Sequence, residues 1–158
     1  MRQMFIGAEE VVAPFMRDML DTPGGFYSGR GLGVFDVLPG VDPPQAKILA
    51  GIWFDYYTGA NMMIHVAAQP GSRWMSKQLL WYTFYYPFVE CGCRRLTGMV
   101  AESNHAAREF DGRMGFKLEG RMKDAAPDGD VLIYAMFRED CRWLSLVHKI
   151  PEIRSRIN

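Results

Sequence analysis

The feature that most constrains the fold is a double change of hydrophobic period between residues 62 and 101. Residues 62–71, "MMIHVAAQPG", have the pattern of a strand that stops at a Pro-Gly turn. Residues 72–92, "SRWMSKQLLWYTFYYPFVECG", have the pattern of a long apolar and aromatic helix, and "CRRLTGMVA" (93–101) returns to a strand. A strand–helix–strand crossover is nearly always right-handed and gives a parallel pair. We therefore expect the strands at 62–68 and 93–100 to be parallel neighbours.

Within the crossover, two residues indicate where the helix is interrupted. Ser72 is expected to cap its amino end, because a serine hydroxyl can accept a hydrogen bond from the first free amides. Pro87 is expected to kink or end the regular part. The aromatic run "WYTFYYPF" is expected to pack in the core, with a subunit contact as the alternative.

Shorter elements lie on either side of the crossover. Residues 8–20, "AEEVVAPFMRDML", predict an amphipathic helix with Pro14 inside it and apolar residues at Val11, Val12, Phe15, Met19 and Leu20. Two strands, at 33–40 and 46–61, then lead into the strand at 62–68 as an antiparallel meander. After the crossover we expect a helix at 103–115, a strand at 116–122, a turn at 123–130 and a strand at 131–139. The result is a mixed α/β sheet with helices on both faces.

Length and charge limit the classes of function. The chain has 158 residues, 49% of them hydrophobic, which suits one domain over 1–158 with residues 140–158 as a carboxyl-terminal extension. The net formal charge is zero, which argues against broad nucleic-acid or membrane-surface binding. No apolar run approaches the roughly 18 residues of a membrane span, and no leader is recognisable. Three cysteines without a pairing pattern indicate a reduced, cytoplasmic setting, and three scattered histidines predict no metal site.

The second half of the chain carries a more specific pattern. It reads "RR...V...N..A......GF..EG....A..DGD...Y.M.RE" across "CRRLTGMVAESNHAAREFDGRMGFKLEGRMKDAAPDGDVLIYAMFREDCRWL". This pattern resembles the GNAT (GCN5-related N-acetyltransferase) superfamily, particularly its ribosomal-protein branch and the small acetyltransferases of phages and prophages. The resemblance implies a GNAT fold, a mostly antiparallel sheet with a splayed parallel pair. It also implies transfer of an acetyl group from acetyl-CoA to an amine.

The resemblance also implies where acetyl-CoA or CoA binds. The pantetheine arm would pair with the strand backbone at Val66, Ala67 and Ala68. The pyrophosphate would lie on amides of the following loop and helix start, residues 69–74, because unpaired amides there favour anions. In this stretch Gly71, Ser72, Arg73 and Trp74 are the expected contacts. Ser72 and Trp74 replace the small residues of the family pattern, and Arg73 can offset part of that change by pairing with phosphate.

The helix at 103–115 would supply further contacts. Asn104 matches a family asparagine beside the pantetheine arm, and an ordinary helix cap is its alternative role. Ala107, Phe110 and Met114 form its apolar face, with Ala107 expected beside the cofactor and Gly115 as a left-handed cap.

Asp111 stands where many relatives have the tyrosine that protonates the departing thiolate. An ionised aspartate cannot donate a proton, but burial would raise its pKa. The alternative is a helix-edge carboxylate paired with Arg108 or Arg113. Tyr82, Tyr85 and Tyr134 are other hydroxyls able to serve.

The amine must lose a proton before it attacks, which requires a general base. Candidates are His65, Asp55 and Glu102, each with a structural role as its alternative. Phe26 and Tyr27 are candidates for an acceptor wall. Asp124, Asp128 and Asp130 would attract a cationic amine, or belong to a solvated turn.

The sequence therefore predicts an acetyl-CoA-dependent N-acetyltransferase acting on a primary amine of a protein or a small molecule, in the cytoplasm of a host cell if the gene is a phage's. The alternative is a non-catalytic GNAT-fold interaction protein, such as a virion or host-takeover component. A toxin-like tRNA acetyltransferase is disfavoured by the neutral charge. A homodimer is left open.

Overall fold

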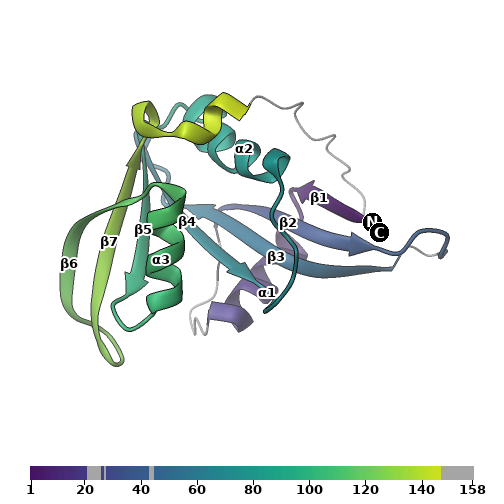
Figure 1. The fold of residues 1–158 in the computed structure, drawn as a ribbon, viewed down its shortest axis with the longest axis horizontal. Helices are drawn as coiled ribbons and strands as arrows, with labels where there is room; N and C mark the ends of the chain where they lie inside the picture. The colour runs from purple at the N-terminus through teal and green to yellow at the C-terminus, as the bar shows by residue number, and fades with distance from the viewer. Residues whose placement is uncertain (21–25, 27, 43–44, 147–158) are drawn as a thin grey trace. The chain divides into compact units, whose positions relative to one another are not determined.

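The computed structural model describes residues 1–20, 26, 28–42 and 45–146. The seven strands are β1 (Arg2–Ile6), β2 (Arg30–Val37), β3 (Ala46–Asp55), β4 (Asn61–Ala68), β5 (Arg95–Ala101), β6 (Lys117–Ala126) and β7 (Gly129–Phe137) (Figure 1). The helices are α1 (Glu9–Leu20), α2 (Lys77–Tyr85) and α3 (His105–Met114), with a π-helix η1 (Tyr86–Glu90) and two 3-10 segments, η2 (Arg138–Asp140) and η3 (Arg142–Leu146).

The strands form one mixed sheet in the order β1-β2-β3-β4-β5-β7-β6. β4 and β5 are parallel and pair at Asn61↔Arg95, Met62↔Leu96 and Met63↔Thr97. The pairs β1–β2, β2–β3, β5–β7 and β6–β7 are antiparallel. The parallel pair predicted from the crossover is therefore confirmed, and so is the mixed α/β sheet.

The chain divides into two compact units. The first unit contains Met1–Asp55 and Ile64–Thr83, and the second unit contains Tyr56–Met63 and Phe84–Leu146. β4 contributes its first three residues to the second unit and the rest to the first.

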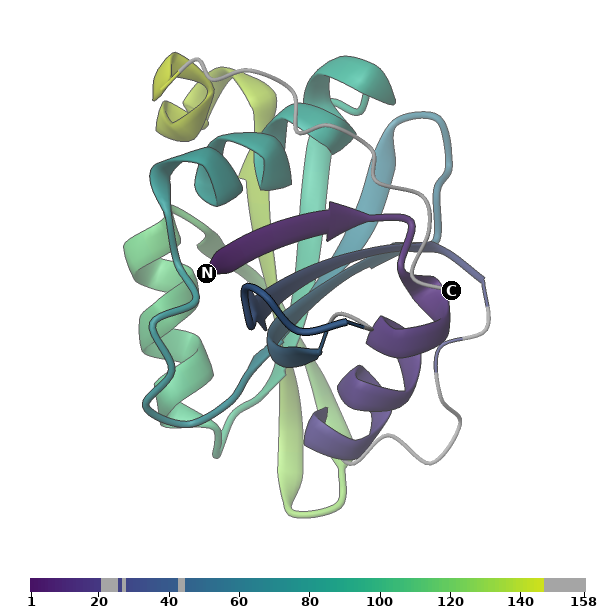
Figure 2. The same ribbon diagram turned by 90° about the vertical axis from the view of Figure 1, so that its right-hand side faces the viewer.

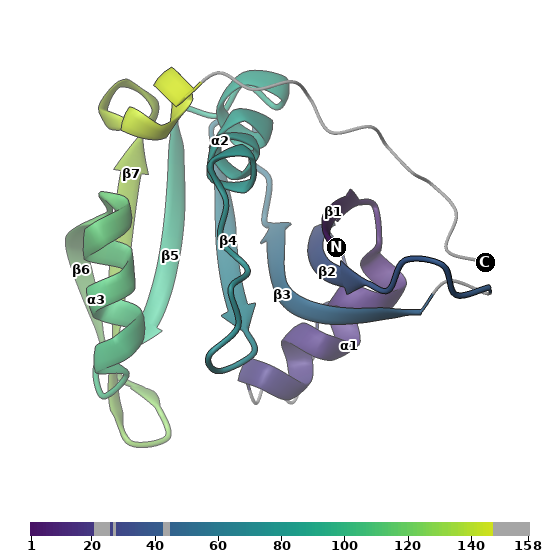
Figure 3. The same cartoon turned by 45° about the vertical axis from the view of Figure 1, so that its right-hand side comes forward.

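The core of the first unit forms where α1 packs along β2 and β3 (Figures 2 and 3). Val12 and Met16, one helical turn apart, are fully buried, and Trp53 and Ala67 complete their cluster. Glycine makes the approach close: a Cβ on Gly51 would lie 2.7 Å from Met16 Sδ. The expected apolar face was partly wrong, because Val11, Met19 and Leu20 are exposed.

The second unit has an aromatic core built from the end of α2, η1, the residue before β6 and η3. Phe84 stacks on Phe88 and on Trp143, with ring centroids 6.5 and 6.4 Å apart, and is tilted against Phe116. The indole of Trp143 donates a hydrogen bond of 2.7 Å to Met114 O, which fixes the segment after β7. The aromatic run of the crossover therefore packs in the core, as expected.

Several boundaries differ from the sequence prediction. β1 was not predicted; it is a half-buried edge strand, and its short sequence has no clear period. The crossover helix begins at Lys77 rather than near Ser72, and it passes into the π-helix η1 at Tyr86, one residue before Pro87. The strand β6 runs to Ala126, so the predicted turn is shorter. Residues 147–158 of the expected carboxyl-terminal extension lie outside the described residues.

Candidate functional site

A histidine–carboxylate pair joins β3 and β4 in the first unit. His65 Nε2 lies 3.0 Å from Asp55 Oδ1, and both side chains are mostly buried, at 23% and 13% exposure. Asp55 is the last residue of β3, and the short β3–β4 connection returns the chain beside it. A carboxylate that accepts the Nε2 proton fixes the tautomer that leaves Nδ1 with a lone pair. Two of the three predicted bases thus form one hydrogen-bonded pair, in which His65 can take a proton.

One aromatic ring packs against the histidine of this pair. The ring of Phe26 meets the His65 imidazole edge-on at 5.1 Å and lies 5.7 Å from the Trp53 ring. Trp53 is 2% exposed, and its indole nitrogen has no hydrogen-bond partner among the described residues. Phe26 was predicted as part of an acceptor wall, and the structure places it against the predicted base. Tyr27, its predicted companion, lies outside the described residues.

The loop after β4 has its own hydrogen-bond pattern. Gln69 N donates to Leu49 O of β3 at 2.8 Å, and Ser72 N closes a turn onto Gln69 O at 3.1 Å. The Ser72 hydroxyl donates to the same carbonyl at 2.7 Å. Ser72 was therefore wrongly predicted as the helix cap. Ser76 performs that role, accepting a bond of 3.1 Å from Leu79 N.

In the rest of this loop, backbone carbonyls are hydrogen-bonded, whereas several backbone amides are not. Its carbonyls at Arg73 and Met75 are bound by the Arg2 guanidinium from β1. By contrast, the amides of Gly71, Arg73 and Met75 donate to no protein group within the described ranges. Gly71 has a φ of +70°, with no atom within 4 Å of where a Cβ would stand. The loop thus presents unpaired donors beside the exposed Arg73 side chain, an arrangement that suits an anion.

The other predicted cofactor contacts of the first unit lie on β4. Ala67 is buried in the core cluster with Val12, whereas Val66 and Ala68 are only partly buried. Trp74 is partly buried too, so its bulk is not fully in solvent.

In the second unit, α3 begins and ends as the sequence predicted. Asn104 is the amino-terminal cap, its Oδ1 accepting from Ala107 N at 3.1 Å. Gly115 closes the other end with a φ of 106° and donates to Asp111 O. The cap uses the side-chain oxygen of Asn104, which accepts from Ala107 N. The side-chain amide nitrogen of Asn104 takes no part in this bond.

Asp111 lies on α3 over β5. A Cβ on Gly98 would stand 3.7 Å from its Oδ2, so the carboxyl packs against the strand where no side chain intervenes. Burial raises the pKa of Asp111 to about 6. The predicted alternative, an ion pair with a neighbouring arginine, was wrong. Arg113 pairs with Glu109, and Arg108 donates to Glu102 O at 3.0 Å.

Glu102 has the opposite environment. Both of its oxygens accept from Arg121, at 2.7 and 2.8 Å, and Arg121 also binds Asp130 at 2.7 Å. Hydrogen bonds from Arg121 hold the pKa of the Glu102 carboxyl below its usual range. Asp130 also accepts from Asp124 N, at 3.0 Å. A carboxylate so engaged binds a proton weakly, which argues against Glu102 as the base.

Sequence reasoning did not find every residue that shapes these features. Two residues were missed: Arg2, which binds the loop carbonyls, and Ser76, which caps α2. Ser76 could have been found, because a serine can accept a hydrogen bond from the amide three residues later, here that of Leu79. Arg2 had none, because its partner carbonyls are far along the chain.

Other chemistry can be checked within the described part of the chain. No group of three or more His, Cys, Asp or Glu side chains there could hold a metal ion. None of its helices is both long and apolar enough for a membrane crossing. Cys91, Cys93 and Cys141 are free thiols.

Comparisons with known proteins place the fold. The structure matches a point mutant of the spermidine N-acetyltransferase SpeG from Vibrio cholerae with a TM-score of 0.64, at 12% identity, over 87% of this chain and 94% of that chain. A GNAT-family acetyltransferase from Bacillus anthracis matches with a TM-score of 0.60, at 18% identity, over the same shares. The Campylobacter jejuni N-acetyltransferase PseH, in complex with acetyl coenzyme A, matches at 0.52 and 19% identity, over 79% and 76%.

No family model and no curated protein matches the sequence. Identities this low establish the fold alone, and that fold is the predicted GNAT fold, with acetyltransferases as its solved neighbours.

Proposed function

We propose that this protein is an acetyl-CoA-dependent N-acetyltransferase that acetylates a primary amine. The observation that carries the proposal is the Asp55–His65 pair, a partly buried base on the central strands of a fold whose solved neighbours are acetyltransferases. A positioned base contributes roughly 10²–10⁴-fold to proton-transfer chemistry.

The residues present fit acetyl-CoA at the loop after β4. Its diphosphate needs amide and cationic donors, and the loop offers the unpaired amides of Gly71, Arg73 and Met75 with the Arg73 guanidinium. When bound, acetyl-CoA supplies an acetyl group activated as a thioester. We also assign cofactor contacts to Val66, Ala67, Ala68, Ser72 and Trp74, and to Asn104 and Ala107 on α3.

His65 would take the proton from the attacking amine at Nδ1, while Asp55 holds the ring and stabilises the imidazolium that forms. Phe26 would bound the space beside the imidazole and exclude water. Burial raises the pKa of Asp111 to about 6, so this carboxyl keeps its proton to a higher pH than an ordinary aspartate, which supports it as the proposed donor to the leaving thiolate.

The first test is binding. Thermal unfolding with acetyl-CoA and with CoA should show stabilisation, since a ligand at 100 times its Kd adds about 2.7 kcal/mol. No shift at millimolar cofactor would end the enzyme proposal. Binding without turnover on any amine would instead support the non-catalytic alternative, an interaction protein with a GNAT fold.

The second test is turnover, followed as CoA release. Spermidine is a suitable first acceptor, because a solved neighbour is a spermidine N-acetyltransferase; peptide amines follow. We expect His65→Gln to lower kcat by about 10²-fold or more, and Asp55→Asn to lower it less. His105→Gln is the matched control, since His105 is exposed on α3. Equal rates in His65→Gln and His105→Gln would remove His65 from the mechanism.

The role of Asp111 needs its own variants. If it donates the proton, Asp111→Asn and Asp111→Ala should both lower kcat by about tenfold or more. Asp42→Asn, at an exposed carboxylate with no assigned role, should not. Unchanged rates in both Asp111 variants would leave the carboxyl without a chemical role.

A further inference from the structure

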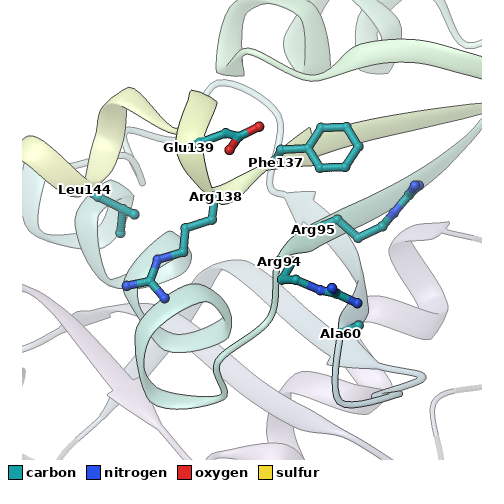
Figure 4. Close-up of a pocket in the computed structure, with 7 residues that line it drawn as sticks. All are labelled: Ala60, Arg94, Arg95, Phe137, Arg138, Glu139 and Leu144. Carbon is teal, nitrogen blue, oxygen red and sulfur yellow. The ribbon is translucent and has the colours of Figure 1, made fainter.

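A hollow in the second unit lies apart from every residue assigned above. Its volume is about 650 Å³, within the range of small-molecule sites. It forms between the turn before β4, the start of β5 and the segment after β7 (Figure 4). The residues that line it are Ala60, Arg94, Arg95, Phe137, Arg138, Glu139 and Leu144.

The backbone beneath the arginines is fixed by hydrogen bonds. Arg94 N and Arg95 N both donate to Ala60 O, at 2.8 and 3.2 Å, and Arg138 N donates to Arg94 O at 3.0 Å. Arg94 and Arg138 therefore hold neighbouring positions next to the Arg95–Phe137 pair of β5 and β7. Like charges at such positions repel each other.

One of the three arginines is already neutralised. Arg95 binds both oxygens of Glu119, at 3.0 and 2.6 Å, and its guanidinium lies 5.7 Å from the Phe137 ring centre. Arg94 and Arg138 make no side-chain hydrogen bond or ion pair within the part of the chain that the structure describes. Two cations in one hollow are thus held by no carboxylate among the described residues, although Glu139 also lines the hollow.

The two free guanidinium groups point away from each other across the hollow (Figure 4). The Glu139 carboxylate leaves the ribbon in the direction opposite to Arg138, so it does not occupy the space that the Arg138 guanidinium reaches. The apolar part of the lining comes from Ala60, Phe137 and Leu144.

We propose that this hollow binds an elongated dianion, with a carboxylate or phosphate at each end and an apolar middle. The guanidinium of Arg94 would bind one end and that of Arg138 the other, each with paired N–H donors. The middle would lie against Phe137 and Leu144. The ligand would also offset the repulsion between the two arginines.

Three probes of equal chain length separate the parts of this proposal: adipate with two carboxylates, hexanoate with one, and 1,6-hexanediol with none. Hexane-1,6-diyl bisphosphate then tells phosphate from carboxylate. Titrations followed by backbone amide NMR signals give both affinity and location. We expect adipate or the bisphosphate to bind about tenfold tighter than hexanoate, with shifts at Arg94, Arg95 and Phe137.

Variants make the test specific. In Arg138→Gln or Arg94→Gln, the dianion should bind no better than hexanoate, because one end has lost its partner. Lys123→Gln removes the same charge from exposed β6 and should change nothing. Either arginine variant suffices if the other fails to fold.

Three results would overturn the proposal. They are equal binding of adipate, the bisphosphate and hexanoate, the same weakening in Lys123→Gln, and shifts confined to residues 69–76 in the first unit. None of them bears on acetyl transfer.

Discussion

Glu102 and Asp111 are two carboxylates of one short stretch of chain, at either side of the start of α3, and their proton affinities move in opposite directions. Glu102 is bound by Arg121 through both oxygens, and its pKa is lowered. Asp111 packs on Gly98 without a cation, and its pKa rises to about 6. The difference shows that partners, not position in the sequence, decide which carboxylate can hold a proton near neutral pH.

The largest expected effect comes from removing the buried charge. The folded pKa of Asp111, about 6, lies above the value of 3.8 for a free aspartate. Asp111 therefore contributes stability that is fully present below about pH 4 and is lost as pH rises through 6. The full shift corresponds to about 3 kcal/mol, which partial exposure reduces to about 1–2 kcal/mol.

Asp111→Asn should accordingly be more stable than the parent by about 1–2 kcal/mol at about pH 8, and no more stable at about pH 4. Urea unfolding at both pH values measures this, with Asp128→Asn as the control. A parent and variant with parallel pH curves would show that Asp111 is not desolvated.

Gly98→Ala should sharpen the contrast with a smaller effect. The added Cβ stands at ordinary contact distance, 3.7 Å from Asp111 Oδ2, and Gly98 does not have a positive φ. We expect a gain of about 0.5 kcal/mol at about pH 4 from the stiffer unfolded chain. The methyl group displaces water from the carboxyl, so NMR titration of Asp111 should give a still higher pKa; a lower one would contradict the packing.

Arg121→Gln should bring the pKa of Glu102 closer to that of an ordinary glutamate. Loss of the guanidinium raises the pKa of Glu102 toward its usual value and slightly lowers Tm at low salt. These side chains are largely exposed, so the loss of Tm should shrink in about 1 M salt. Scanning calorimetry at two salt concentrations tests this, and a salt-independent loss would indicate a packing role instead.

Glu102→Gln is expected to have the smallest effect. Because Glu102 is held by Arg121, it should not serve as the base, and kcat should stay within about twofold of the parent. The measurement is the pH profile of kcat for both proteins. A large loss, or a displaced acidic limb, would restore Glu102 as a catalytic base.

The fold was largely predictable, because its main elements have strong periods. The crossover from β4 to β5 alone required a parallel pair, and Asn104 and Gly115 marked the ends of α3. β1 was not predictable in the same way, because an edge strand of five residues has little pattern of its own.

The candidate site was less predictable, because it depends on contacts between distant segments. Ser72 was predicted as the cap, but its hydroxyl donates to Gln69 O, and Ser76, which the sequence analysis missed, caps the helix instead. The sequence identified Asp55 and His65 separately, and only the pairing of β3 with β4 makes them one base. Likewise, the burial of Asp111 depends on the missing side chain at Gly98.

The bond from Arg2 to the loop carbonyls has a consequence for local unfolding. An edge strand is among the first parts of a sheet to open, and β1 anchors the carbonyls of Arg73 and Met75 through that one side chain. Whenever β1 detaches, the loop loses its hydrogen bonds to Arg2, and its backbone is no longer held in place by β1. The rest of the first unit can remain folded while residues 69–76 lose this contact, so the frequency of β1 opening sets an upper limit on how long the loop keeps its ordered conformation.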